Sequence, residues 1–190
     1  MMTLFHGSSE LFDRFDLSRA GEGTGTKFGF GVYLTESEAS AVHYSQPRNL
    51  KTMTPDHYLY TVEIPELTED NHLFSCKPVP AALVARIETA LGVKAPEKVI
   101  AAGKEFRKWV GCTLTGAQKN GFAEEKAAAE FLNQQGVLYN VWPQAQTKPD
   151  GLKNIAVFHA DNVHIVKREH IEVTVKCGKN VLVEGSKKEV

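Results

Sequence analysis

The stretch GVYLTESEASAVHY, Gly31–Tyr44, places a strand pattern directly before a helix pattern and orders the rest of the chain around it. Its first five residues are rich in β-branched and aromatic side chains, which favours a strand. Thr35 and Glu38 have the spacing of a capping box, so we predict a helix that runs to about Tyr44. Upstream, glycines among small polar residues over 20–30 predict a mobile loop.

Short strand patterns lie on both sides of this stretch and are separated by isolated helices. We expect strands at 3–6, 57–64, 137–141, 155–158 and 163–166, and a helix at 124–135 that Gly136 ends. The chain lacks the regular alternation of strand and helix that builds a parallel sheet. We therefore predict an α+β domain whose two packed, mostly antiparallel sheets form a split central core with flanking helices.

The segment 80–121 differs in character and is predicted to be a peripheral helical insertion. It contains one helix over Ala81–Leu91 and a second whose apolar face is Val99, Ala102, Phe106, Trp109 and Val110. With this insertion the domain spans 1–170. Residues 171–190 then form either a C-terminal hairpin or a loose polar tail.

The composition is that of one soluble domain without a metal site. A chain of 190 residues can bury a sizeable core, and a net charge of −1 gives no overall attraction to nucleic acid or membrane. We find no signal-peptide pattern and no membrane span, so we expect a cytoplasmic protein. The three cysteines and seven histidines are dispersed, without metal-ligand spacing.

Three short motifs follow one another along the first part of the chain. FHGSS (Phe5–Ser9) puts His6 at a strand end, GFGVYLTES follows at Gly29–Ser37, and Tyr44 lies eleven residues after Tyr33. Taken singly, such a histidine is usually structural and such tyrosines usually pack in a core. In combination they resemble the diphtheria-toxin-like and poly(ADP-ribose)-polymerase-like ADP-ribosyltransferases, which carry a His-Gly, a strand tyrosine and a helix tyrosine at this spacing.

The resemblance extends to the second half of the chain. LYTVEIP (59–65), AAEFLNQQGVLYNVWP (128–143) and KNIAVFHADNVHI (153–165) are similar to the transferase domain of phage and mobile-element polyvalent proteins. Only the helical insertion and the tail fall outside it. The resemblance implies an ADP-ribosyltransferase-type split sheet, with NAD as substrate and no metal.

The proposed site residues divide into two roles. Tyr33 and Tyr44 can clamp the flat nicotinamide, with stacking worth about 0.5–2 kcal/mol. The resemblance implies that the backbone of Gly7 pairs with the nicotinamide carboxamide and that His6 binds the adenosine ribose. The expected catalytic set is His6, Tyr33 and Asn154, and the expected NAD-binding set is His6, Gly7, Ser8, Gly31, Tyr33 and Tyr44.

Asn154 departs from the pattern of many relatives, which carry a glutamate there. An amide can hydrogen-bond a ribose hydroxyl, but it supplies neither negative charge nor a general base. This favours transfer of a single ADP-ribose unit over polymer formation. Asp150 or Glu36 is the alternative carboxylate, and Ala41 replaces a serine of the polymerase branch.

Three functions stay open at this point. The first is a mono-ADP-ribosyltransferase that acts as a toxin, phage-defence or effector enzyme, with a neutralising antitoxin as a further partner. The second is a catalytically silent NAD- or nucleotide-binding module. The third is a transferase whose acceptor is RNA or DNA rather than protein, served by the basic residues Lys148, Lys153, Lys167 and Arg168, although scattered charges of this kind are usually a solvated face.

Overall fold

An eight-stranded sheet forms the centre of the protein in this computed structural model, which describes residues 1–20, 26–45, 56–145, 147–148 and 150–190. The strand order is β10-β7-β3-β1-β2-β6-β5-β4, and every neighbouring pair is antiparallel except β4 and β5. The α+β class and the mostly antiparallel sheet are thereby confirmed. The strands are β1 (Met2–Ser8), β2 (Val32–Thr35), β3 (His57–Ile64), β4 (His72–Phe74), β5 (Tyr139–Pro143), β6 (Lys153–Val157), β7 (His164–Ile171) and β10 (Lys188–Glu189).

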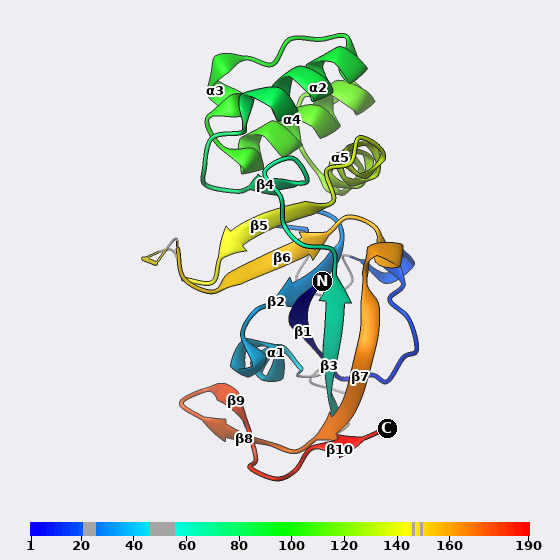
Figure 1. Ribbon diagram of the computed structural model, residues 1–190, viewed down its shortest axis with the longest axis vertical. Helices are drawn as coiled ribbons and strands as arrows, with labels where there is room; N and C mark the ends of the chain where they lie inside the picture. The colour runs from blue at the N-terminus through cyan, green and yellow to red at the C-terminus, as the bar shows by residue number, and fades with distance from the viewer. Residues whose placement is uncertain (21–25, 46–55, 146, 149) are drawn as a thin grey trace.

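Helices lie at one end of this sheet and on one of its faces (Figure 1). The end is covered by a helical layer of α2 (Ala81–Leu91), α3 (Glu97–Ile100), α4 (Gly103–Thr115) and α5 (Phe122–Gln134). The remaining helices are α1 (Glu38–Tyr44) and two 3₁₀ turns, Leu17–Arg19 and Ala160–Asn162. A separate hairpin of β8 (Val173–Lys176) and β9 (Lys179–Leu182) follows β7. Within the described part of the chain, no helix is long and apolar enough to cross a membrane.

The sheet is divided into two halves by a narrow junction. β1 and β3 are registered at seven pairs, from Met2–Ile64 to Ser8–Tyr58, whereas β1 and β2 are registered only at Phe5–Thr35. Figure 1 shows β5 and β6 crossing the direction of β3 and β7 at a large angle. The expectation of two packed sheets is therefore corrected to one sheet, because this single pair keeps the two halves continuous.

The two faces of the sheet are covered differently. Leu4, Leu34, Val62 and Ile155 belong to one apolar cluster, against which Phe12 and Phe15 of the segment after β1 pack. The opposite face carries α1, whose buried Ala41 and Val42 pack with Leu59 and Ile171. A third cluster joins the helical layer to β4 and to Phe30, including Leu73, Leu83, Ile87, Phe106, Val110 and Leu132. The sheet thus has an apolar core on both faces and at one end.

Several predicted bounds need correction. β1 extends to Ser8, so His6 lies within the strand and not at its end. The helix after β2 is capped by Ser37, which accepts a hydrogen bond from Ser40 N (3.2 Å), and not by Thr35. Thr35 lies too early in the chain for that role: it is still paired with Phe5 and Asn154 in the ladder, and its Oγ1 accepts from Ser37 N (3.1 Å).

Other expectations were incomplete. The second predicted helix of the insertion is two helices, α3 and α4, separated by Ala102 in extended conformation (φ −151°). The sequence patterns gave no strand at β4, which has three residues and pairs in parallel with β5. Of the predicted glycine-rich loop, residues 21–25 lie outside the described part of the chain, and Gly29 N closes a turn on Thr26 O (2.9 Å).

Gly7 explains how α1 reaches the sheet. A Cβ atom at this position would lie 1.8 Å from the carbonyl oxygen of Ala41 and 2.9 Å from Ser45 N. Both are backbone atoms, which cannot move without displacing the helix. The close packing of β1 against α1 therefore requires glycine.

We expect Gly7→Ala to lower the free energy of unfolding by more than about 2 kcal/mol, because the helix must move away from the sheet. Urea denaturation measures this loss. Gly121→Ala is the matched control, since its Cβ would meet only the flexible tip of Glu124 (3.0 Å), and we expect a loss below about 1 kcal/mol. Equal losses in the two variants would contradict the explanation.

Candidate active site

His6 and Tyr33 are linked where β1 and β2 separate. His6 Nδ1 lies 2.8 Å from the backbone oxygen of Tyr33, and because a carbonyl only accepts, Nδ1 carries the proton of this hydrogen bond. The ring of His6 is in edge contact with Phe15, with 5.0 Å between ring centroids. A side chain thus connects the two strands just beyond their single registered pair.

Tyr33 is held by the turn that precedes its strand. Its hydroxyl donates to Gly29 O (2.7 Å) and accepts from Phe28 N (3.2 Å). Burial raises the pKa of Tyr33 to about 12, so its hydroxyl is neutral at physiological pH. Tyr33 therefore offers its ring, and not a proton acceptor, to a ligand.

Asn154 shares a face of the sheet with Tyr33. It is paired with Thr35 on β2 and with Trp142 on β5, and side chains at paired positions point to the same face. Tyr33 lies two residues before Thr35, so alternation puts it on that face as well. His6 alternates with Phe5 and lies on the opposite face. Tyr33 and Asn154 of the predicted catalytic set are therefore neighbours on one face of the sheet, and His6 reaches the junction from the other face.

Tyr44 lies at the last position of α1, the helix that packs on Gly7. Tyr44 is 63% exposed, and the centroid of its ring lies 5.1 Å from that of the His43 ring. Among the ring contacts of the described residues, Tyr33 meets Trp142 (5.5 Å) and has no contact with Tyr44. The aromatic clamp stays a prediction that depends on a ligand between the two rings.

The other predicted ligand-binding positions have local structural roles. Ser8 Oγ accepts from Glu10 N (3.0 Å) where β1 ends. A Cβ at Gly31 would lie 2.4 Å from the carbonyl oxygen of Val157, so β2 begins in close contact with β6. Ala41 is buried against Gly7. These residues shape the backbone at the junction whether or not a ligand binds there.

The two alternative carboxylates differ in position. Glu36 Oε2 accepts from Lys153 N (2.6 Å), which places its carboxylate beside the first residues of β6 and next to Asn154. Asp150 has a side chain that is 87% exposed and pairs with Lys77 (3.1 Å). Glu36 is the carboxylate that the fold brings to the site.

Sequence reasoning missed an aromatic and polar group on the same face. Phe28 stacks on Trp142 with 4.3 Å between centroids and 4° between planes, and the Phe28 carbonyl accepts from Asn140 Nδ2 (2.7 Å). Trp142 was within a quoted motif, and its pairing with Asn154 gives it a place at the site. Trp142 lies two residues after Asn140 on β5, and this spacing predicts that both side chains point to the same face of the sheet.

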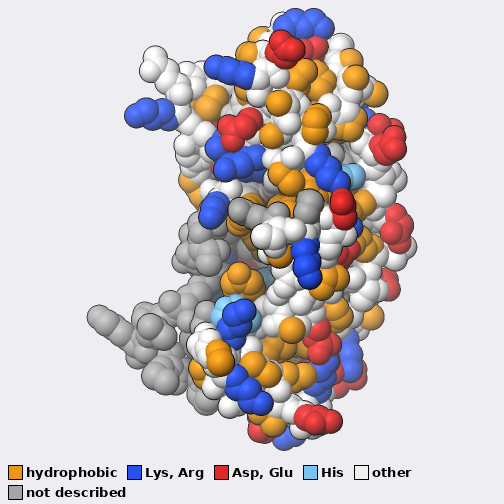
Figure 2. Space-filling view, turned by 90° about the vertical axis from the view of Figure 1, so that its left-hand side faces the viewer, with side chains coloured by type: hydrophobic (Ala, Val, Ile, Leu, Met, Phe, Trp, Pro, Cys, Tyr) orange, Lys and Arg blue, Asp and Glu red, His pale blue; other side chains and the backbone are white. Residues whose placement is uncertain are grey.

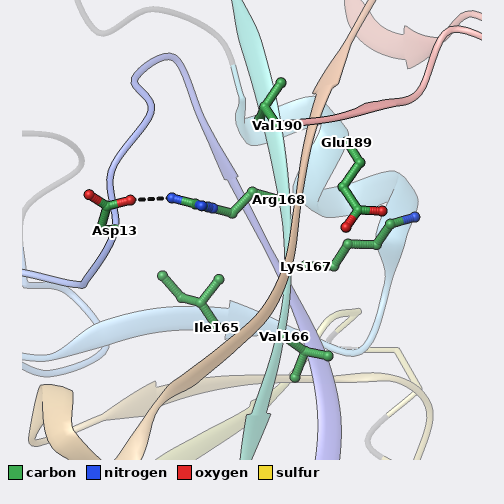
Figure 3. Close-up of a pocket in the computed structure, with 7 residues that line it drawn as sticks. All are labelled: Asp13, Ile165, Val166, Lys167, Arg168, Glu189 and Val190. Carbon is green, nitrogen blue, oxygen red and sulfur yellow. Dashed lines mark hydrogen bonds and ion pairs between the residues drawn. The ribbon is translucent and has the colours of Figure 1, made fainter.

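The basic residues considered for nucleic acid do not gather in one place. Lys153 lies on β6, whereas Lys167 and Arg168 lie on β7, and three strands separate β6 from β7 in the sheet order. Arg168 pairs with Asp13, and both line a hollow of about 380 Å³ beside β10 (Figure 3). Figure 2 likewise shows cationic and apolar side chains interspersed over the face that it presents. Among the residues that the structure describes, no cluster of His, Cys, Asp and Glu could hold a metal ion.

Tyr33→Phe should make stability less sensitive to alkaline pH. An unfolded tyrosine loses its proton near pH ~10, whereas folded Tyr33 keeps it until its raised pKa of about 12, so stability falls as pH rises through this window. Removing the hydroxyl should make that fall shallower, by up to ~1.4 kcal/mol per pH unit. Urea denaturation between pH ~9 and pH ~11 measures the slope.

The control for this slope is Tyr44→Phe. Tyr44 is 63% exposed, so its removal should leave the slope of the wild-type protein unchanged. The other buried tyrosines are present in all three proteins and their contributions cancel. Identical slopes for Tyr33→Phe and wild type would show that the Tyr33 hydroxyl is not held as described.

Comparison with known proteins gives no match for this chain. No family model matches its sequence. No curated protein and no solved structure matches it. The residues and geometry of the β1–β2 junction are therefore the basis for its function.

Proposed function

We propose that the protein is an NAD-dependent mono-ADP-ribosyltransferase whose substrate site lies at the junction of β1 and β2. One observation carries the proposal: the motif residues His6 and Tyr33, far apart in the sequence, are joined by a 2.8 Å hydrogen bond where the ladder between the strands stops. Asn154, the third motif residue, lies on the strand next to Tyr33. An ADP-ribosyltransferase-type fold with NAD as substrate accounts for this grouping.

The reaction breaks the bond between nicotinamide and the ribose C1′ atom. The electron pair leaves with nicotinamide, C1′ gains positive character, and an acceptor nucleophile forms a new bond to C1′ and releases its proton. Such a step depends on holding the leaving group and the ribose in place. Tyr33 and Tyr44 would supply flat surfaces for nicotinamide, and the Gly7 backbone would bind its carboxamide.

Asn154 decides the expected product. Its amide can donate a hydrogen bond to a ribose hydroxyl oxygen or accept one from the hydroxyl, worth about 0.5–1.5 kcal/mol. It cannot deprotonate a hydroxyl of an earlier ADP-ribose unit, and Glu36 is engaged by the backbone of Lys153. These groups support attachment of one unit to a macromolecular acceptor, in the manner of a toxin, phage-defence or effector enzyme that an antitoxin would neutralise.

Among the described residues, the carboxylate next to Asn154 is that of Glu36, which already accepts a hydrogen bond from the Lys153 backbone, and this supports a second candidate. A module that binds NAD without cleaving it would need the same junction and the same tyrosines. It would not need a group that stabilises the positive charge at C1′. Transfer activity separates this silent module from the enzyme.

We expect the protein to label a cell lysate from radioactive NAD⁺, with single ADP-ribose units on each modified site by mass spectrometry. Asn154→Ala should lower transfer by roughly 2- to 12-fold, which corresponds to one lost hydrogen bond. Asn154→Glu should retain or raise NAD⁺ hydrolysis. Lys94→Met is the control and should transfer as wild type does, because Lys94 lies in the connection between α2 and α3 and its side chain is 89% exposed.

Each other outcome has a definite meaning. NAD⁺ binding without any label would favour the silent module. Chains of ADP-ribose would contradict mono-transfer, and unchanged kinetics in Asn154→Ala would remove Asn154 from the site in favour of Glu36. Loss of the label on nuclease treatment, but not on protease treatment, would identify a nucleic-acid acceptor.

A further inference from the structure

A buried ion pair in the helical layer touches the turn that holds Tyr33. Arg107 of α4 is 0% exposed and Glu125 of α5 is 2% exposed. Arg107 Nε donates to Glu125 Oε2 (2.7 Å) and Nη2 donates to Oε1 (3.1 Å). Asn120 Nδ2 adds a third hydrogen bond to the carboxylate, at 2.8 Å. The pair is thus bidentate and removed from water.

Packing alone does not account for this pair. A buried ion pair loses hydration, and an apolar pair of similar volume often stabilises a core equally well or better. In addition, Arg107 Nη1 is buried without a hydrogen-bond partner among the residues that the structure describes, which adds to the cost. The pair is therefore better explained by something that it positions.

The guanidinium lies against the backbone of Gly29. A Cβ at Gly29 would be 3.2 Å from Arg107 Nε and 3.4 Å from its Cζ, and Gly29 has φ +109°, which favours glycine. The carbonyl of Gly29 accepts the hydroxyl hydrogen bond of Tyr33 (2.7 Å). A continuous set of contacts therefore runs from the helical layer to the ring expected to bind nicotinamide.

The residues on each side of Gly29 anchor the same turn, 28–31. Phe28 stacks on Trp142 and its carbonyl accepts from Asn140, both on β5. Phe30 is 4% exposed and belongs to the apolar cluster of the helical layer. Arg107 supplies a flat, rigid surface between these two anchors.

We propose that Arg107 and Glu125 are positioning residues, which set the 28–31 turn and through it the Tyr33 ring for NAD⁺ binding. This inference rests on the proposed function for its ligand, but the position of the turn is a property of the protein alone. The helical layer is then part of the substrate site, because Arg107 of that layer packs against Gly29 of the turn.

The test replaces the pair by Arg107→Met with Glu125→Met, which keeps the volume and removes both charges. It is made in a Trp109→Phe background, so that Trp142 is the only one of the two tryptophans left. Trp142 is 9% exposed under Phe28, and a displaced turn should at least double its acrylamide quenching constant. The KM for NAD⁺ should rise roughly 10-fold, with a smaller change in kcat.

Two further variants keep the result interpretable. Ile87→Val is the control, because Ile87 is equally buried in the helical layer, and it should lower the Tm without changing the quenching or the KM. Should the methionine pair fail to fold, Arg107→Lys keeps a charge for Glu125 but removes the planar group beneath Gly29, and it should give the same two changes.

Unchanged Trp142 quenching in a folded variant would overturn the inference, whatever the protein binds. A raised KM that Ile87→Val reproduces would also overturn it, since general loss of stability would then suffice. If the wild-type protein does not bind NAD⁺, the proposed function fails, and the quenching measurement still decides whether Arg107 and Glu125 position the turn.

Discussion

The single registered pair between Phe5 and Thr35 joins the two halves of the sheet and sets how β1, β2 and α1 meet. Beyond this pair, β1 stays paired with β3 and β2 stays paired with β6, so the two halves of the sheet turn away from each other. Gly7 then admits the backbone of α1 against one face, and the ring of His6 spans the opening to the Tyr33 carbonyl. Strand edges that separate in this way leave backbone groups near side chains that can recognise a ligand.

The elements that local pattern determines were predictable. His57–Ile64 and Ala81–Leu91 have the predicted bounds. The first is rich in aromatic and β-branched residues and is followed by Pro65, and the second carries an apolar stripe at helical spacing. Gly136 was expected to end α5, and it has φ +78° just after that helix. Signals of this kind lie within a few neighbouring residues.

The site depends on contacts that no local pattern contains. β4 has three residues and owes its existence to β5, about 65 residues later, so its own sequence carries too little signal. The position of His6 within β1 became clear only from the extent of the strand, which runs to Ser8. Ser37 caps the helix, since Thr35 is still paired in the ladder. Arg107 and Glu125 lie on two different helices, 18 residues apart in the sequence, and no local pattern pairs them before the fold brings them together.

The proposed function places NAD⁺ at the β1–β2 junction, on the face shared by Tyr33 and Asn154. A crystal structure of the protein with a non-cleavable NAD⁺ analogue tests this claim most directly. We expect nicotinamide to stack on the Tyr33 ring, with Tyr44 closing from α1. The nicotinamide carboxamide should bind the Gly7 backbone, and the adjoining ribose should lie within hydrogen-bond distance of Asn154. An analogue bound elsewhere, such as the hollow lined by Asp13 and Arg168, or a junction that stays empty at saturating analogue, would contradict it.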